Sequence, residues 1–168
     1  MKDLKLLLFD VDGVLTDGTI LIHADGTESK HFNIRDGAGI VWAQRVGLSI
    51  GLLSARTADA TAVRAAQLGI KIVSQGGADK LAEFDRILAG AGLTQSEVGY
   101  MGDDLQDLPV LRRAGFSAAP ADAAAEVRAA VHWVSPSGGG HGAARECIEH
   151  VLRAQGHWQA AVSGFLDC

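Results

Sequence analysis

Short apolar segments alternate with segments of helical periodicity along most of the chain, and this alternation limits the fold more than any other feature. Short apolar runs that end at polar residues are typical of strands buried on both faces of a sheet. Between these runs, apolar residues recur every three or four positions, as in an amphipathic helix. Strands that alternate with helices pair in parallel, with helices on both faces. The sequence therefore predicts a doubly wound α/β fold.

The two periodicities divide the chain into strands and helices almost to its C-terminus. The strands predicted for the sheet are Lys5–Phe9, Ser49–Leu53, Lys71–Ser74, Val98–Met101 and Phe116–Ala119, with Val131–Val134 as an additional candidate. The predicted helices are Gly39–Val46, Ala58–Leu68, Lys80–Ala91, Leu105–Ala114, Ala123–Ala130 and Ala143–Ala154. Because 168 residues suit one domain with a sizeable core, we assign residues 1–168 to one domain and leave the structure of residues 157–168 open.

One segment departs from this alternation. Thr19–His23 and Glu28–Phe32 are two extended segments that flank the sequence Ala24-Asp25-Gly26-Thr27. An Asp-Gly pair supplies the positive-φ positions of a tight turn, so we predict a β-hairpin over residues 17–33. Its isoleucines give the hairpin an apolar face that has no obvious partner in its own chain.

Composition excludes several classes of partner. The formal net charge is −5 and the chain has no run of Lys or Arg, so we expect neither a nucleic acid nor an anionic membrane as a partner. No stretch approaches the ~20 apolar residues of a membrane span, and the first apolar run is too short for a signal peptide, so we expect a cytoplasmic protein. Cys147 and Cys168 lie far apart and are expected to be reduced thiols.

Polar residues gather at the places where a parallel sheet positions ligand chemistry, just beyond the carboxyl ends of its strands. They are, in chain order, Asp10-Val11-Asp12-Gly13, Ser54-Ala55-Arg56, Asp79-Lys80 and Gly102-Asp103-Asp104, with Asp107 one helical turn further on. Taken alone, each has an ordinary explanation as a turn, a helix cap or a solvated charge. Together and in this order they favour one shared functional site.

The residue types in this set suit phosphoryl transfer. Asp10, Asp12 and Asp103 supply hard oxygen ligands, and a shared Mg²⁺ would relieve their mutual repulsion. Asp10 and Asp12 are two positions apart on an extended segment, so both side chains point toward the same reacting centre. Ser54 offers a hydroxyl and Lys80 a cation for phosphate oxygens. A carboxylate nucleophile, an acid/base, a metal and two phosphate-binding groups fit transfer through an aspartyl-phosphate.

The motifs D-x-D-G-V-L-T-D-G, a strand-end Ser, a Lys and G-D-D-x-x-D resemble the four motifs of the haloacid dehalogenase superfamily. The resemblance implies that Asp10 is the nucleophile and a metal ligand. It implies that Asp12 is the general acid/base, with its carbonyl on the metal, and that Asp103 completes the ligands of Mg²⁺. Ser54 and Lys80 are the implied phosphate-binding pair. The implied supporting residues are Asp104 and Asp107, with Asp107 orienting Lys80 or the metal shell.

A closer resemblance runs from Lys5 to about Gly156. Phe32–Gly37, Gln75-Gly76, Gly102–Leu105 and Gly139–Glu146 are similar to segments of the 3-deoxy-D-manno-octulosonate 8-phosphate (KDO 8-phosphate) phosphatases. The resemblance implies a capless member of the superfamily with a hairpin insertion, acting on a phosphorylated sugar acid in lipopolysaccharide biosynthesis. It also implies a homotetramer in which hairpins assemble and neighbouring subunits complete each site. The implied substrate contacts are Asn33, Ile34, Arg35, Asp36, Gly37, Arg56 and Arg64.

Some features leave alternatives open. The family usually has Gly where this chain has Ala55, and several relatives have a basic residue where it has Val41. The glycine-rich run at 138–142 indicates a flexible loop by composition and a lid by resemblance. The alternatives are a phosphatase for another 2-keto-3-deoxy sugar acid phosphate, an accessory subunit resembling the small subunit of phenylphosphate carboxylases, and a receiver-like phosphoacceptor module. Against the receiver, the segment after the third strand has Ser74-Gln75-Gly76 where a receiver carries its phosphorylated Asp.

Overall fold

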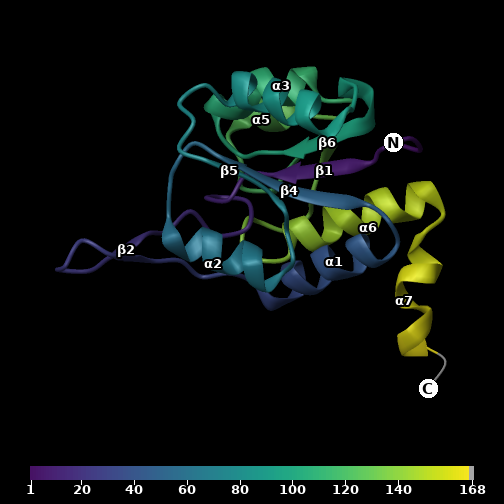
Figure 1. The fold of residues 1–168 in the computed structure, drawn as a ribbon, viewed down its shortest axis with the longest axis horizontal. Helices are drawn as coiled ribbons and strands as arrows, with labels where there is room; N and C mark the ends of the chain where they lie inside the picture. Colours follow the sequence, from purple (N-terminus) through teal and green to yellow (C-terminus); the bar gives the residue numbers. More distant parts are fainter. Residues whose placement is uncertain (167–168) are drawn as a thin grey trace.

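A parallel sheet of six strands forms the centre of the protein in the computed structural model, which describes residues 1–166. The strand order is β5-β4-β1-β6-β7-β8 (Figure 1). The strands are β1 (Leu6–Phe9), β4 (Ser49–Ser54), β5 (Ile72–Gln75), β6 (Val98–Met101), β7 (Phe116–Ala119) and β8 (Trp133–Val134). The predicted doubly wound parallel sheet is confirmed, including the additional candidate strand at its edge.

Helices cover both faces of the sheet, because successive side chains of each strand point to opposite sides. In β1, Leu7 and Phe9 pack in one core cluster, and Leu6 and Leu8 in the other. The first cluster is covered by α1 (Ile34–Arg45), α2 (Asp59–Gln67) and α6 (Ala143–Gln155). The second is covered by α3 (Lys80–Ala91), α4 (Leu108–Arg113) and α5 (Ala125–Ala130). Figure 1 shows α3 and α5 above the sheet and α1, α2 and α6 below it.

Two of the predicted helices differ from the structure by more than one or two residues at an end. Helix α1 begins at Ile34 instead of Gly39, because the Asn33 side chain caps it by accepting a hydrogen bond from the Arg35 amide at 2.8 Å. The predicted helix Leu105–Ala114 is divided into a 3₁₀ turn, η2 (Leu105–Asp107), and α4. A second 3₁₀ turn, η1 (Gln95–Glu97), precedes β6.

The C-terminal segment that the sequence left open forms a further helix, α7 (Trp158–Leu166). Aromatic contacts hold it against α1, with the ring centroid of Trp42 lying 6.2 Å from that of Trp158 and 5.2 Å from that of Phe165. Cys147 is a buried thiol in α6, and Cys168 lies outside the described residues.

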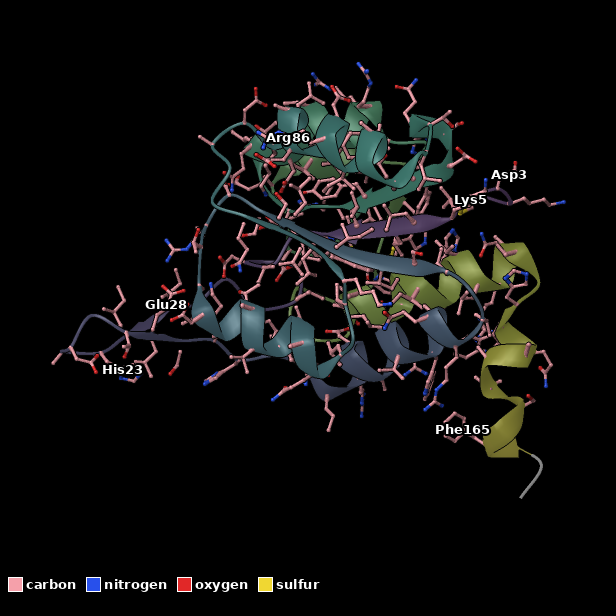
Figure 2. The ribbon with its side chains drawn as sticks, in the orientation of Figure 1. Asp3, Lys5, His23, Glu28, Arg86 and Phe165 are labelled. Carbon is pink, nitrogen blue, oxygen red and sulfur yellow. The ribbon has the colours of Figure 1, made fainter. Side chains whose placement is uncertain are left out.

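The predicted hairpin is present, with shorter strands than expected. Only β2 (Leu21–Ile22) and β3 (Glu28–Ser29) pair, and Gly26 has the expected positive φ of 85° in the turn. The hairpin projects away from the sheet and helices, with Glu28 near its base and His23 farther out (Figures 1 and 2). Leu21 and Ile22 are 55% and 71% exposed, so its apolar side chains have little cover within the chain.

The connections between the early strands are short. Only the hairpin and α1 lie between β1 and β4, and only α2 and β5 lie between β4 and α3, so residues 1–166 contain no separate cap domain. None of the described helices is long and apolar enough to cross a membrane. Strand β1 lies at the point where the strand order reverses, with β4 on one side and β6 on the other. In doubly wound sheets ligands bind beyond the strand ends at such a point.

Candidate active site

Asp10 occupies the centre of the site, directly after β1. Its amide donates to the Met101 carbonyl at 2.9 Å, and its Oδ1 accepts from the Val11 amide at 2.7 Å. The side chain is buried, although a carboxylate of this kind is normally solvated. The ends of β1 and β6 therefore fix both the backbone and the carboxylate of Asp10.

A buried lysine joins Asp10 to the loop after β6. Lys80, the first residue of α3, donates to Asp10 Oδ2 and to Asp107 Oδ1, both at 2.7 Å. Tyr100 donates its hydroxyl to the same Asp107 oxygen at 2.5 Å. The Asp79 side chain caps α3 and so fixes the start of the helix that carries Lys80. The structure brings Asp10, Lys80 and Asp107 into one hydrogen-bonded network.

The second oxygen of Asp107 holds the loop that carries the remaining acids. Asp107 Oδ2 accepts from the amides of Asp103 and Asp104 at 3.0 and 3.2 Å. This pairing turns the Asp103 carboxylate toward Asp10, and the facing Gly13 leaves room, since a Cβ there would lie 2.0 Å from Asp103 Oδ2. Asp104 is exposed and caps η2, so it supports the loop without entering the cluster.

The site concentrates negative charge away from water. Burial raises the pKa of Asp10 to about 6, and the Asp107 charge adds to this against the opposing effect of Lys80. Burial raises the pKa of Asp103 to about 7, with further contributions from Asp10 and Asp107. Burial would lower the pKa of Lys80, but the adjacent carboxylates outweigh it and raise that pKa. Lys80 is therefore a fixed cation, and a second cation would favour the charged forms of Asp10 and Asp103.

These acids fit a divalent cation. Carboxylate oxygens of Asp10, Asp103 and Asp107 lie within 4.8 Å of one another, and Asp103 Oδ1 is buried without a hydrogen-bond partner. Asp107 is already used by Lys80, Tyr100 and two amides, which leaves Asp10 and Asp103 as the carboxylates with free acceptor capacity. Hard carboxylate oxygens are the ligands that Mg²⁺ prefers.

Asp12 lies in a second group of charges. Lys30, from the hairpin, donates to Asp12 Oδ1, and Arg56 Nε lies 3.5 Å from Asp12 Oδ2. Glu28, also from the hairpin, accepts from Arg56 Nη2 at 2.8 Å and lies 3.4 Å from Lys30 Nζ. Sequence reasoning missed Glu28 and Lys30. The available signal was a pair of opposite charges two positions apart on a predicted strand, which places both on one face.

Ser54 ends β4, the strand next to β1, and is buried. Its Oγ accepts a hydrogen bond from the Arg56 amide at 3.3 Å, which stabilises the turn after the strand. Ser54 thus lies at the carboxyl end of the strand that neighbours β1, and the half-exposed Arg56 side chain extends from the same turn toward the hairpin.

The other predicted substrate contacts do not join this cluster within one chain. Asn33 caps α1 and donates to the Gly140 carbonyl at 3.0 Å, and the buried Asp36 accepts from the Arg145 amide at 2.7 Å. Ile34 and Arg35 are exposed. Arg64 packs at Gly37, where a Cβ would lie 2.3 Å from its Nη2. Within residues 1–166 none of these side chains is hydrogen-bonded to Asp10, Asp12 or Asp103.

The glycine-rich run is packed against the loop that follows β1. The Gly140 amide donates to the Val14 carbonyl at 3.0 Å, and the Gly139 amide donates to Asp122 Oδ1 at 2.9 Å. A Cβ at Gly139 would lie 1.9 Å from the Gly13 carbonyl oxygen, so only glycine permits this approach. In this structure the run gives close backbone support to residues 13–17.

Comparisons with known proteins agree with this geometry. Residues 51–146 match the family described as haloacid dehalogenase-like hydrolase. The 3-deoxy-D-manno-octulosonate 8-phosphate phosphatase KdsC of Escherichia coli strain K12 is 39% identical over 155 residues, which cover 92% of this chain and 82% of that protein.

Solved structures give the same result. A probable YrbI family phosphatase from Pseudomonas syringae has a TM-score of 0.96 at 46% identity, covering 98% of this chain and 94% of that one. The KDO 8-phosphate phosphatase of Moraxella catarrhalis, solved with a magnesium ion, a phosphate ion and a KDO molecule, has a TM-score of 0.95 at 35% identity with the same two coverages. The chain belongs to the haloacid dehalogenase-like hydrolases, in the group that contains the KDO 8-phosphate phosphatases.

Proposed function

We propose that this protein is a Mg²⁺-dependent phosphatase that hydrolyses KDO 8-phosphate to KDO and inorganic phosphate through an aspartyl-phosphate on Asp10. The observation that carries the proposal is the buried Asp10 carboxylate, held by Lys80 and the Val11 amide at the switch point of the sheet. These contacts aim a carboxylate at the place where a phosphate ester would bind. A carboxylate held in this way is suited to nucleophilic attack on phosphorus.

In the first half-reaction, an Asp10 oxygen forms a bond to phosphorus while the bond from phosphorus to the sugar oxygen breaks. Asp12, in its protonated form, gives its proton to the departing sugar oxygen, which leaves as a hydroxyl. Lys80 stays charged beside Asp10 and faces the phosphoryl oxygens together with the Ser54 hydroxyl.

In the second half-reaction, a water oxygen forms a bond to phosphorus and the bond from phosphorus to Asp10 breaks. The Asp12 carboxylate accepts the proton of that water, so inorganic phosphate leaves and both aspartates return to their starting states. When Mg²⁺ is bound, it neutralises charge on the phosphoryl oxygens. Asp10, Asp103 and the Asp12 carbonyl are the groups that would hold it.

The substrate assignment rests on a second cation site. The Lys80 ammonium donates to Asp10 and Asp107 and would face the phosphoryl group, so a carboxylate on the sugar needs its own partner. Arg56 is half-exposed, and its planar guanidinium suits a carboxylate. Glu28 already pairs with Arg56, so a sugar carboxylate would share or displace that contact.

A substrate panel tests this function. We expect KDO 8-phosphate to be hydrolysed with a much higher kcat/KM than glucose 6-phosphate or phenyl phosphate, which lack the carboxylate. Arg56→Ala should remove roughly 10- to 100-fold of that preference, the worth of one charge-assisted contact, and change turnover of phenyl phosphate little. If phenyl phosphate matched KDO 8-phosphate, the accessory-subunit alternative would replace this assignment. A preference for a different 2-keto-3-deoxy sugar acid phosphate would change the substrate but keep the chemistry.

We also propose that the protein works as a homotetramer assembled through its hairpins. The exposed Leu21 and Ile22 support this, because large apolar side chains projecting from a hairpin gain by burial in an interface. Such an assembly would also cover a site that no cap domain closes. It would bring segments such as Asn33–Gly37 and Arg64 near a neighbour's site, where they could contact substrate.

A further inference from the structure

We propose that Lys30 is a positioning residue for the general acid/base, holding Asp12 Oδ1 so that Oδ2 is the oxygen that exchanges the proton. The inference rests on the proposed function, since it assigns a role to a residue acting through Asp12. Lys30 lies on the hairpin, outside the four motifs that carry the chemistry.

Lys30 is buried in a way that a surface lysine is not. Its side chain is 1% exposed, although the hairpin that carries it projects from the body of the protein (Figure 1). Lysines are almost never fully buried unless they are paired, because removing an ammonium from water is costly. The partners present are Asp12 Oδ1, to which Lys30 donates a hydrogen bond, and Glu28 Oε1 at 3.4 Å.

The two oxygens of Asp12 are in different situations. Oδ1 is occupied by Lys30, whereas Oδ2 is buried and has no hydrogen-bond partner among the described residues. Arg56 Nε lies 3.5 Å from Oδ2, which is long for a hydrogen bond. Oδ2 is therefore the oxygen left free for the leaving oxygen of the substrate and later for water.

The hydrogen bond from Lys30 restricts rotation of the Asp12 carboxylate about its terminal torsion. The terminal torsion of Asp is broad, so an unheld carboxylate samples many orientations. Proton transfer needs the donor oxygen within hydrogen-bond reach of the reacting oxygen, and a small misplacement costs much of the rate. A lysine fixed to one oxygen sets the direction of the other.

Glu28 holds Lys30 and the base of the hairpin in place. It pairs with Lys30 and, at 2.8 Å, with Arg56, so it holds the base of the hairpin to the turn after β4 (Figure 2 shows Glu28 at that base). Burial would raise the pKa of Glu28, but Lys30 and Arg56 outweigh it and lower that pKa, so Glu28 is a carboxylate that both cations hold. The position of the hairpin therefore affects the orientation of the Asp12 carboxylate through Lys30.

The test compares two substrates that differ in their need for a general acid. The kcat/KM for phosphoenzyme formation would be measured for KDO 8-phosphate and for p-nitrophenyl phosphate, whose leaving group departs without a proton. Lys30→Met should lower kcat/KM for KDO 8-phosphate by roughly 10- to 100-fold and for p-nitrophenyl phosphate by less than about 3-fold. Lys71→Met, at an exposed lysine that makes no contact with the site residues named above, is the control and should change neither value.

Equal losses on the two substrates would overturn the proposal, because a purely structural role does not depend on the leaving group. A direct contact of Lys30 with the sugar would also spare p-nitrophenyl phosphate, and it is excluded by the following comparison. A double variant adds a second criterion. In the Asp12→Asn background, Lys30→Met should change kcat/KM by less than about 2-fold, since a residue acting through Asp12 has nothing left to position. A further large loss in that background would contradict it.

Two outcomes separate this inference from the proposed function. If Asp12→Asn kept wild-type activity on both substrates, the acid/base role of Asp12 would fail, and Lys30 would lose its role with it. If Asp12→Asn lost activity but Lys30→Met did not, only the inference would fail. Should Lys30→Met not fold, Lys30→Arg keeps the buried charge and takes its place, with a smaller loss expected on KDO 8-phosphate alone and equal losses again contradicting the proposal.

Discussion

Two lysines with buried side chains lie beside Asp10 and Asp12, the proposed catalytic aspartates, and they are held by different parts of the molecule. Lys80 is fixed from the core of the sheet, by Asp10 after β1 and by Asp107 and Tyr100 around the end of β6. Lys30 is fixed from a hairpin whose strands pair over only two residues each. The proposed nucleophile, Asp10, is therefore held by the core of the sheet. The proposed acid/base, Asp12, is held partly by a peripheral segment, the hairpin that carries Lys30.

The largest difference between the two lysines should appear in stability and activity when each is replaced by Met in turn. Lys80→Met leaves Asp10 and Asp107, whose side chains are 4% and 0% exposed, as uncompensated buried carboxylates. We expect it to lower the free energy of unfolding by about 3–5 kcal/mol and to remove roughly 10³-fold or more of the activity. Lys30→Met should cost less stability, because Asp12 and Glu28 are each 19% exposed and Arg56 remains beside them.

Chemical denaturation in metal-free buffer measures this difference, with Lys71→Met as the reference for losing one exposed lysine. A Lys30→Met variant that was destabilised as much as Lys80→Met would remove the distinction between a core-held and a hairpin-held group.

A second prediction tests whether the hairpin holds the proposed tetramer together. Leu21→Asp combined with Ile22→Asp should dissociate the proposed tetramer, because charges replace the exposed apolar side chains. Activity should fall with the assembly, while the fold and the Asp10–Lys80 network stay intact. Sedimentation together with circular dichroism checks both expectations. Val134→Asp, at the edge strand β8, is the control.

A fully active wild-type monomer at micromolar concentration would contradict the proposed role of the hairpin in assembly. So would a double variant that stayed tetrameric.

A smaller effect concerns stability: the stabilisation of the protein by Mg²⁺ should depend on pH through Asp10 and Asp103. The pKa values of Asp10 and Asp103 are raised to about 6 and about 7, above those of an unfolded chain. Between about pH 4 and pH 7 the metal-free folded state therefore holds more protons than the unfolded state, so its stability falls as pH rises through this window. Mg²⁺ replaces those protons, and the rise in Tm on adding Mg²⁺ should be larger at about pH 8 than at about pH 5.

Thermal unfolding with and without Mg²⁺ at the two pH values measures this, and Asp103→Asn should reduce the gain. A gain that was independent of pH would mean that the ion binds away from Asp10 and Asp103.

The sequence was sufficient where the signal is local. Three of the strands that position the site are short apolar runs, and Asp10, Ser54 and Asp103 lie within two residues of their ends, whereas Lys80 is the first residue of the predicted helix Lys80–Ala91. Asn33 is also a local helix-start signal, but Gly37 and Gly39 lower the helical propensity of the first turns, and the predicted helix began at Gly39 instead of Ile34.

The contacts that the sequence did not predict depend on segments far apart in the chain. Lys30 becomes part of the site only because the hairpin folds back onto the loop after β1, 18 positions away along the chain. Gly139 approaches Gly13 only because α6 packs against α1. A charged residue on a hairpin and a run of glycines have many ordinary explanations until such packing is known.

The central claim is that Asp10 forms a covalent intermediate, and the stereochemical course at phosphorus tests it most directly. The wild-type enzyme would be given a substrate whose phosphoryl group is made chiral with oxygen isotopes, and the phosphoryl group would be transferred to an acceptor alcohol. Attack by Asp10 followed by attack on the aspartyl-phosphate gives two in-line displacements, so we expect retention of configuration. Inversion would mean a single displacement by the acceptor, with Asp10 acting only as a metal ligand.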